Sequence, residues 1–212
     1  MKISNLFHSF LVVSFWMAAA SAVEFTGTAT VKTIAGINVQ VFPTANVTVD
    51  EATIPVRLSG SGVRKKLVLF FTVDVYAATS YVEDPAQLQA ANPMEGIRGS
   101  RAKVLQLTML RNMSGADIRT AFEEALDLNA VDLNNPAVRS VLGRFNMEAR
   151  PGDIFTVAGF TKANGEQGVE IKFPSTTTQD SGTGLADDFW KVWFGTPIDD
   201  EMLTLQRALI GQ

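Results

Sequence analysis

The stretch SGSGVRKKLVLFFTVDVYAATSYV, residues 59–82, joins a glycine-rich start to three consecutive cations and a long apolar segment. Its Val, Phe and Tyr content is typical of β-strands. Arg64 is either a surface charge at the start of a strand or a side chain aimed inward at a ligand. The segment does not match a phosphate-binding loop, because it lacks the Gly-Lys-Ser/Thr ending and the third glycine of a dinucleotide fingerprint. Taken alone, these residues favour a turn followed by a charged strand start, and we keep that interpretation for Lys65 and Lys66.

Working outward from this stretch, the hydrophobic pattern predicts strands on both sides of it. Alternation of apolar and polar residues, rich in Val, Ile and Thr, predicts strands across residues 24–82 and again at 102–112. A hairpin is expected from residues 153–161 and 168–173, with a turn at Asn164-Gly165.

Apolar residues spaced three and four apart predict helices in the second half of the chain. The first of these segments begins with Ser114 as a helix N-cap and Asp117 three residues later, a capping-box pattern. The expected helices span residues 114–129, 135–149, 185–195 and 199–211.

Strands first, helices inside, then a hairpin and two closing helices are typical of an α+β fold. The simplest packing is a sheet covered on one face by helices. Residues 84–92 are expected to form only a short helical turn that Gly96 and Gly99 end, and residues 175–184 a polar loop. Neither a repeat nor a linker divides the chain, so residues 23–212 are expected to form one domain.

The first 22 residues have the features of a secretory signal peptide. Lys2 provides a positive start, residues 10–20 form an apolar core, and the small residues 20–22 offer a cleavage site. We therefore expect cleavage after Ala22 and an exported product, periplasmic or secreted. No later run approaches the roughly 20 apolar residues of a membrane helix, so stable membrane insertion is not expected.

Two residue types that many enzymes need are missing from the expected mature chain. The sequence has no cysteine, and its single histidine, His8, lies in the signal peptide. This excludes Ser-His-Asp and Cys-His catalysis, thiol redox chemistry and histidine metal ligation. The acidic cluster at residues 199–201 stands where a helix begins and suits the helix dipole. We therefore expect neither a metal nor a cofactor.

The charge balance limits the classes of partner that the protein is expected to bind. Without Lys2 the chain has 17 basic and 22 acidic residues. This net negative charge argues against nucleic acid or an anionic membrane as a partner. A small anion in a local basic pocket remains compatible with it, and the sequence does not identify a protein partner.

In the order of its segments, the chain resembles the chalcone isomerase-like family, which includes plant chalcone isomerases, fatty-acid-binding relatives and exported bacterial homologues. Three segments are similar to family motifs. They are GSGVRKKLVLFFTVDVYAATSYV (60–82), LTMLRNMSGADIRTAFEEAL (107–126) and FWKVWFGTPIDDEMLTLQRALIG (189–211). The resemblance implies an open-faced β-sandwich, in which a large antiparallel sheet lies beneath a layer of helices with an apolar cleft between them.

The resemblance implies a site laid out as in true chalcone isomerases. In those enzymes an arginine stabilises the substrate anion, while a tyrosine and a threonine polarise its ketone. An asparagine and a polar-plus-aliphatic pair hold the far end of the substrate. Such catalysis is electrostatic placement, so loss of the polar groups removes most of it. Here Arg64 matches the arginine and Thr72 matches the threonine.

The other family positions are apolar in this chain. Ile118 stands at the tyrosine position, Ala125 at the asparagine position, and Val192 and Trp193 at the polar-plus-aliphatic pair. Met113 falls at a pocket position and is apolar as well. Ring closure on a chalcone is therefore not expected.

The leading hypothesis is an exported, non-catalytic protein that binds a small amphipathic anion such as a fatty acid. Arg64 would receive the carboxylate, while Phe71, Met113, Ile118 and Trp193 would line the apolar part. In the fatty-acid-binding relatives a tyrosine accompanies the arginine, and Tyr76 or Tyr81 could replace it here.

Three alternatives stay open. In the first, the protein is an isomerase or intramolecular lyase that uses Arg64, Thr72 and water on an unknown conjugated substrate. In the second, it is a structural or partner-binding protein whose cleft is filled by its own side chains. The third concerns Arg64 alone, which could pair with an internal acid such as Asp74 instead of a ligand.

Overall fold

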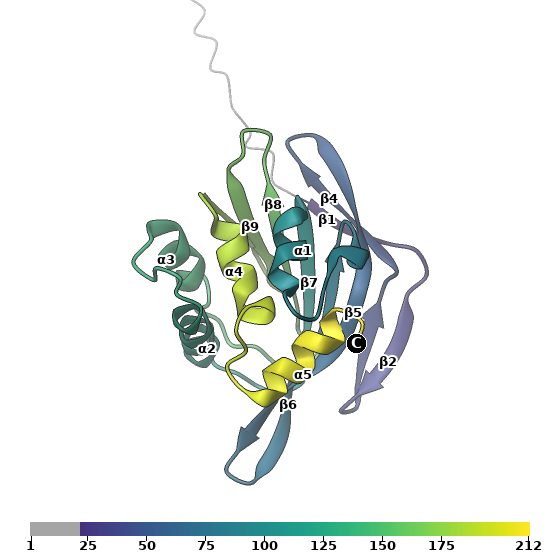
Figure 1. Cartoon of the computed structure of the whole chain (residues 1–212). Helices are drawn as coiled ribbons and strands as arrows, with labels where there is room; N and C mark the ends of the chain where they lie inside the picture. The colour runs from purple at the N-terminus through teal and green to yellow at the C-terminus, as the bar shows by residue number, and fades with distance from the viewer. Residues whose placement is uncertain (1–21) are drawn as a thin grey trace, which may run out of the picture.

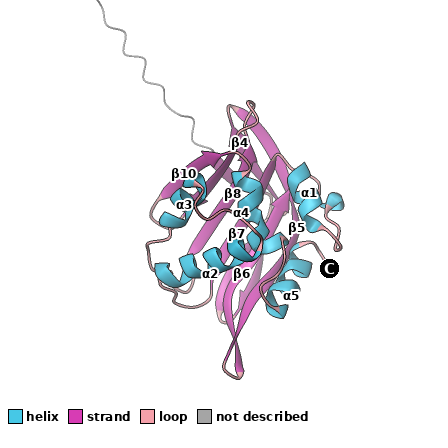
Figure 2. Cartoon of the chain, turned by 60° about the vertical axis from the view of Figure 1, so that its left-hand side comes forward, coloured by secondary structure: helices cyan, strands magenta, loops and turns pink. Residues whose placement is uncertain are grey.

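A curled antiparallel sheet with a layer of helices on one face makes up the computed structural model, which describes residues 22–212 (Figures 1 and 2). The eight strands of this sheet lie in the order β1-β4-β5-β6-β7-β8-β9-β10, and β2 pairs with β3 in a separate hairpin. The strands are β1 (Ala22–Thr26), β2 (Thr30–Ile34), β3 (Ile37–Val41), β4 (Thr44–Val49), β5 (Ala52–Val68), β6 (Phe71–Val82), β7 (Ala102–Met109), β8 (Ile154–Thr161), β9 (Gln167–Lys172) and β10 (Thr177–Gly182).

The helices lie together over one face of the sheet (Figure 1). Three of them, α2, α4 and α5, contribute residues to the wall of a cavity between the helices and the sheet. A one-turn 3₁₀ helix precedes them at Pro85–Gln87. The helices are α1 (Pro93–Gly99), α2 (Gly115–Leu128), α3 (Pro136–Gly143), α4 (Leu185–Phe194) and α5 (Asp200–Leu209). None of the helices within residues 22–212 has the length and apolar character needed to cross a bilayer.

The α+β fold class expected from the sequence is confirmed, and so is the N-cap at the start of α2. The Ser114 hydroxyl accepts a hydrogen bond from the backbone N–H of Asp117 at 3.1 Å and donates one to the Asp117 carboxylate at 2.7 Å. The predicted signal peptide lies outside the described residues except for Ala22, the first residue of β1.

The main core lies between the sheet and the helices. Amphipathic helices bury their apolar stripes there, and α4 buries nearly its whole length, including Trp190 and Trp193. A second core lies on the opposite face, where the curled sheet brings β4 and the first half of β5 over β6, β7 and β8. Its members are Ala45, Val47, Val49, Ile54, Val56, Tyr81, Ala102, Val104, Ala158 and Phe160.

Three local expectations differ from the structure. Residues 177–182 form the edge strand β10 rather than a polar loop, because they pair with β9 and their Ser and Thr side chains tolerate a half-exposed edge. Residues 93–99 form α1, with Pro93 at its first position, where proline suits a helix start. Helix α3 ends at Gly143 instead of continuing to residue 149.

Helix α5 lies directly against β5, and two glycines make this close approach possible. A Cβ added to Gly60 would lie 2.1 Å from the backbone oxygen of Ala208, and one added to Gly62 would lie 2.7 Å from the Ala208 side chain. The Ser59 hydroxyl lies within hydrogen-bond distance of the carbonyl oxygens of Leu209 and Ser80, at 2.9 and 3.0 Å, and its one proton can be donated to either. The glycine-rich start of the quoted stretch therefore seats the last helix against the sheet.

We predict that Gly60→Ala destabilises the fold by about 3 kcal/mol, because the new methyl group can be accommodated only by moving the α5 backbone. Urea unfolding followed by circular dichroism would measure the change. The control is Gly99→Ala, whose Cβ meets no atom within 4 Å and which should stay within about 1 kcal/mol of the wild type. Equal effects of the two substitutions would contradict this account of the β5–α5 contact.

Candidate functional site

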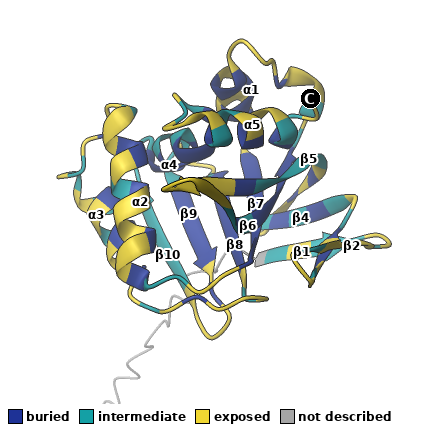
Figure 3. Ribbon diagram, turned by 90° about the horizontal axis from the view of Figure 1, so that it is seen from below, coloured by how far each residue is buried: buried dark blue, intermediate teal, exposed yellow. Residues whose placement is uncertain are grey.

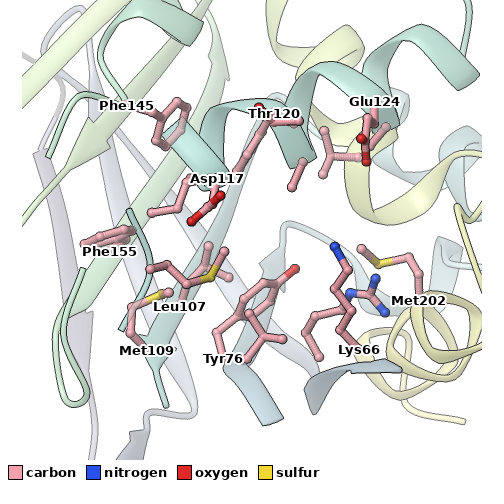
Figure 4. Close-up of a pocket in the computed structure, with 18 of the residues that line it drawn as sticks. Lys66, Tyr76, Leu107, Met109, Asp117, Thr120, Glu124, Phe145, Phe155 and Met202 are labelled. Atoms are coloured by element: carbon pink, nitrogen blue, oxygen red, sulfur yellow. The ribbon is translucent and has the colours of Figure 1, made fainter. Parts of the chain in front are cut away.

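A cavity of about 540 Å³ lies between the sheet and the helix layer. Strands β5 to β9 form its floor, α2 its roof, and α4 and α5 its far side (Figure 4). Most of the floor and roof is apolar. The apolar lining residues are Val68, Val75, Leu107, Met109, Met113, Ile118, Ala121, Phe122, Ala125, Phe145, Phe155, Val157, Ile171, Val192, Ile198 and Met202.

Charged residues gather at the exposed rim of the cavity. Lys66 reaches it from the sheet, and Asp117 and Glu124 reach it from α2, as Figure 4 shows. Arg111 lies on the loop between β7 and α2, and is exposed like the other three. The cavity therefore has an apolar interior and a rim of mixed charge, which is an arrangement suited to an amphipathic ligand.

Arg64 lines the cavity and is also bound to Asp199 through both carboxylate oxygens. Its Nη1 donates to Oδ1 and its Nη2 to Oδ2, each at 2.7 Å. Nη1 also donates to the backbone oxygen of Lys65. The Arg64 side chain is 9% exposed and that of Asp199 is 40% exposed, so the pair lies at the edge of the core. Such a bidentate pair is among the stronger protein ion pairs.

Asp199 has a second structural role as the N-cap of α5. Its Oδ1 accepts a hydrogen bond from the backbone N–H of Met202 at 2.7 Å. Partial burial would on its own raise the pKa of Asp199. The hydrogen bonds from Arg64 and Met202 and the positive charges of Arg64 and Lys66 outweigh burial, so the pKa lies below its ordinary value of 3.8. Asp199 is therefore ionised at neutral pH.

Tyr76 is the direct neighbour of Arg64 across the β5–β6 pair. Its hydroxyl accepts a hydrogen bond from the indole N–H of Trp193 at 3.2 Å. Burial raises the pKa of Tyr76 to about 12, although Arg64 and the indole hydrogen bond act in the opposite direction. The phenol therefore keeps its proton at neutral pH. None of the hydrogen bonds found within residues 22–212 uses that proton, and the hydroxyl lies on the cavity wall (Figure 4).

A bulge helps to bring these side chains together. Arg64 pairs with Tyr76 and Lys65 pairs with Asp74, so Val75 has no partner on β5. Bulges bend a strand and re-aim its side chains. As a result Val75 and Tyr76, although consecutive, both line the cavity.

The structure places five of the predicted site residues on the cavity wall. They are Arg64, Met113, Ile118, Ala125 and Val192. Trp193 does not line the cavity but contacts two residues that do. It is 1% exposed and packs edge-on against the ring of Phe122. Its indole N–H donates a hydrogen bond to the Tyr76 hydroxyl. Whether these residues bind a ligand stays a prediction.

Phe71 and Thr72 lie outside the cavity, contrary to the expected arrangement. Both are at the exposed start of β6, where Phe71 pairs with Val68 and Thr72 with Leu67. The β5–β6 hairpin extends beyond the body of the protein (Figure 1), and of its last residues only Val68 lines the cavity. Phe71 is 74% exposed.

Asp74 is not the partner of Arg64, because Asp199 takes that place from a position 135 residues further along the chain. Asp74 instead lies opposite Lys65 on the neighbouring strand. The prediction that Arg64 could pair with an internal acid is therefore right in kind, but the acid is Asp199 and not Asp74. Asp199 stands at a helix start as expected, and it also binds Arg64.

Of the two tyrosines that could accompany Arg64, the structure places Tyr76 beside it on the cavity wall. Lys66 was not among the predicted site residues. Tyr81, the other candidate tyrosine, lies on the opposite face, where its hydroxyl accepts a hydrogen bond from the backbone N–H of Phe42. Lys66 follows Arg64 by two residues, and that spacing on a strand is the signal that could have found it. Within residues 22–212, no three His, Cys, Asp or Glu side chains cluster in a way that could hold a metal ion.

Comparison with known proteins agrees with this architecture. A family model described as chalcone isomerase-like matches residues 32–211. The chain belongs to the chalcone isomerase-like family. No match was found among the curated proteins.

One of the solved structures similar to this family member is the crystal structure of a fatty-acid binding protein of Arabidopsis thaliana. The two chains superpose with a TM-score of 0.54 at 15% sequence identity. The match covers 86% of this chain and 96% of the plant protein. At this identity the likeness establishes the shared fold.

We predict that Asp199→Ala destabilises the protein by about 2 kcal/mol, because it leaves the Arg64 guanidinium unpaired and removes the N-cap of α5. A fully buried pair would lose more, but Asp199 is 40% exposed. Urea unfolding at pH 7 would measure the loss. The control is Asp200→Ala, which removes a neighbouring exposed acid and should change stability by less than about 0.5 kcal/mol.

The same pair predicts a pH dependence. Because the folded pKa of Asp199 lies below 3.8, its contribution is complete above the unfolded pKa and is lost as the pH falls through the folded pKa. The stability difference between wild type and Asp199→Ala should therefore shrink between pH 7 and about pH 2. A difference that stays constant over this range would mean that the pair does not stabilise the fold through its charge.

Proposed function

We propose that the protein binds a small amphipathic anion, such as a fatty acid, in the cavity and does not transform it chemically. The observation that supports this most directly is an apolar cavity whose wall carries Arg64, Tyr76 and Lys66 close together on two neighbouring strands. The apolar interior suits a hydrocarbon chain, and the polar cluster suits a carboxylate.

The size of the cavity supports a ligand of this kind. Small-molecule sites commonly measure roughly 300 to 1,000 Å³, and this cavity measures about 540 Å³. Burial of a hydrocarbon chain contributes about 25 cal/mol for each Å² removed from water. The replacement of polar family positions by Ile118 and Ala125 extends the apolar surface available for that contact.

The polar cluster has donors left for an anion. Arg64 uses three of its N–H groups in hydrogen bonds with Asp199 and Lys65 among the described residues, and a guanidinium has five. The Tyr76 hydroxyl retains its proton for donation. Lys66 adds a positive charge that offsets Asp199, so a carboxylate placed here meets a net positive group of side chains.

The same geometry supports binding without catalysis. The isomerase alternative required Thr72 beside Arg64, and Thr72 is on the exposed hairpin. The tyrosine and asparagine positions of the family are the apolar Ile118 and Ala125. The alternative of a self-filled cleft is disfavoured by the cavity beside Arg64. The name of the plant structural neighbour makes fatty acids the natural first ligands to test.

We further propose that the protein acts outside the cytoplasm, in the periplasm or as a secreted product. The support is the positive, apolar and small-residue pattern of residues 1–22. Protein recovered from its own host should then begin at Val23 when its N-terminus is sequenced. Recovery of the chain with residues 1–22 still attached would contradict export by cleavage.

Native mass spectrometry of the mature protein from its host should detect a bound carboxylic acid, and calorimetry with dodecanoate should detect binding to the emptied protein.

We predict that Tyr76→Phe weakens dodecanoate binding about tenfold, because a hydrogen bond to a charged carboxylate is lost. Dodecanol, which has the same chain without the charge, should bind more weakly than dodecanoate.

The matched control is Tyr81→Phe, which removes the same atom from the other face of the sheet and should leave dodecanoate affinity unchanged. Thermal unfolding of both variants accounts for the hydrogen bonds that each substitution deletes. The proposal fails if the wild type does not bind dodecanoate, or if both variants weaken binding equally.

A further inference from the structure

The end of the β5–β6 hairpin is an exposed group of apolar side chains, which we call the apolar tip. It consists of five consecutive residues, Leu67, Val68, Leu69, Phe70 and Phe71, which are 62%, 43%, 83%, 91% and 74% exposed. The tip projects from the body of the protein in two different views (Figures 1 and 2). In Figure 3, where exposed residues are yellow, the end of the hairpin is yellow. Isolated exposed apolar residues are common, but a contiguous group of this kind marks an interaction site.

The turn within the tip is built from residues that local conformation does not favour. Val68 pairs with Phe71, so Leu69 and Phe70 form the two-residue connection. Leu69 has φ +57°, in the left-handed region where Gly, Asn or Asp are the usual residues of such turns. A leucine here makes the turn less favourable and places a large apolar side chain in water. Folding does not account for that choice, whereas contact with an apolar partner does.

Positive charge flanks the tip. Lys65 and Lys66 immediately precede it and are exposed. Asp74 lies opposite Lys65 on β6, so the two lysines outnumber the single acid at the base of the tip. The protein as a whole is negative, with a formal net charge of −4. Salt limits the reach of charges to about 10 Å at 0.1 M ionic strength, so the local cations dominate the field at a surface that touches the tip.

We propose that the apolar tip docks reversibly on a phospholipid membrane, with Leu69, Phe70 and Phe71 entering the interfacial region and Lys65 and Lys66 contacting anionic headgroups. Aromatic and aliphatic side chains beside lysines are the combination that binds such an interface. A second protein is a poorer fit. A stable protein interface buries about 800 Å² on each partner, and the narrow convex end of a two-stranded ribbon provides little flat surface.

The base of the tip and the rim of the cavity share residues. Lys66 and Val68 belong to both, so a docked tip would bring the cavity entrance to the membrane surface. An amphipathic ligand could then enter from the bilayer without crossing water. Docking itself depends only on the tip and does not require that the cavity ligand be a fatty acid.

The test is flotation of the mature protein with vesicles of phosphatidylcholine, with and without phosphatidylglycerol. The wild type should bind, more tightly to vesicles with phosphatidylglycerol and less tightly as salt is raised. The variant Leu69→Asn/Phe70→Gly should lower the partition coefficient at least about tenfold, because two large apolar side chains are lost. Its Asn-Gly turn suits a two-residue hairpin, so the fold should be kept.

Two single variants separate the charge contribution from general effects. Lys65→Gln should weaken binding to the anionic vesicles about fivefold and leave binding to neutral vesicles nearly unchanged. Arg139→Gln removes an exposed cation from α3, away from the hairpin, and should have no effect. The unfolding midpoint and dodecanoate affinity of the tip variant show whether fold and cavity are intact.

Three results would overturn the proposal. The first is a wild type that does not float with either kind of vesicle. The second is a tip variant that floats as well as the wild type. The third is concentration-dependent self-association that the tip variant abolishes, without vesicle binding. That result would assign the tip to contacts between copies of the chain.

Discussion

The ion pair between Arg64 and Asp199 joins the middle of the sheet to the last helix, and the arrangement of the cavity depends on it. Arg64 lies on β5 beside the bulge at Val75, while Asp199 caps α5. The contact at Gly60 and Gly62 brings α5 close enough for the two charges to meet. Sheet, helix and cavity wall are therefore positioned together, so a change to the pair alters both stability and site.

A chain of polar contacts continues from this pair into the core. Tyr76 lies next to Arg64, and its hydroxyl accepts the hydrogen bond of the Trp193 indole from α4. Polar groups in such surroundings are costly unless each finds a partner, so they hold one arrangement of the sheet and two helices. The same polarity gives an otherwise apolar cavity a defined end. A ligand carboxylate would share the Arg64 guanidinium with Asp199, which sets an electrostatic limit on affinity.

The secondary structure could be predicted largely because its periodicities are local. Alternation marked the strands, and spacing of three and four marked α2, α4 and α5. The family resemblance assigned Ile118, Ala125 and Val192 to the cleft, and all three line the cavity. Helix geometry fixes which side chains share a face, so positions on a helix of known register carry over well.

The polar half of the site could not be predicted in this way. Asp199 lies 135 residues from Arg64, and only the packing of α5 on β5 brings them together. The facing of Tyr76 depends on a bulge that leaves no local sequence pattern. Phe71 and Thr72 were misplaced because an apolar run looks the same whether a strand is buried or ends in a projecting hairpin. The partial exposure of β10 likewise follows from its edge position, which its Ser and Thr content alone does not reveal.

The contact between Trp193 and Tyr76 also gives the molecule a built-in optical reporter. Trp190 and Trp193 are the two tryptophans of the described chain, and both lie in α4. Indole emission responds to hydrogen bonding and to nearby charge, and one of these indoles donates to a hydroxyl on the cavity wall. An anion placed beside Tyr76 would change the field at that ring. Occupancy of the cavity could thus be followed through intrinsic fluorescence, without a label.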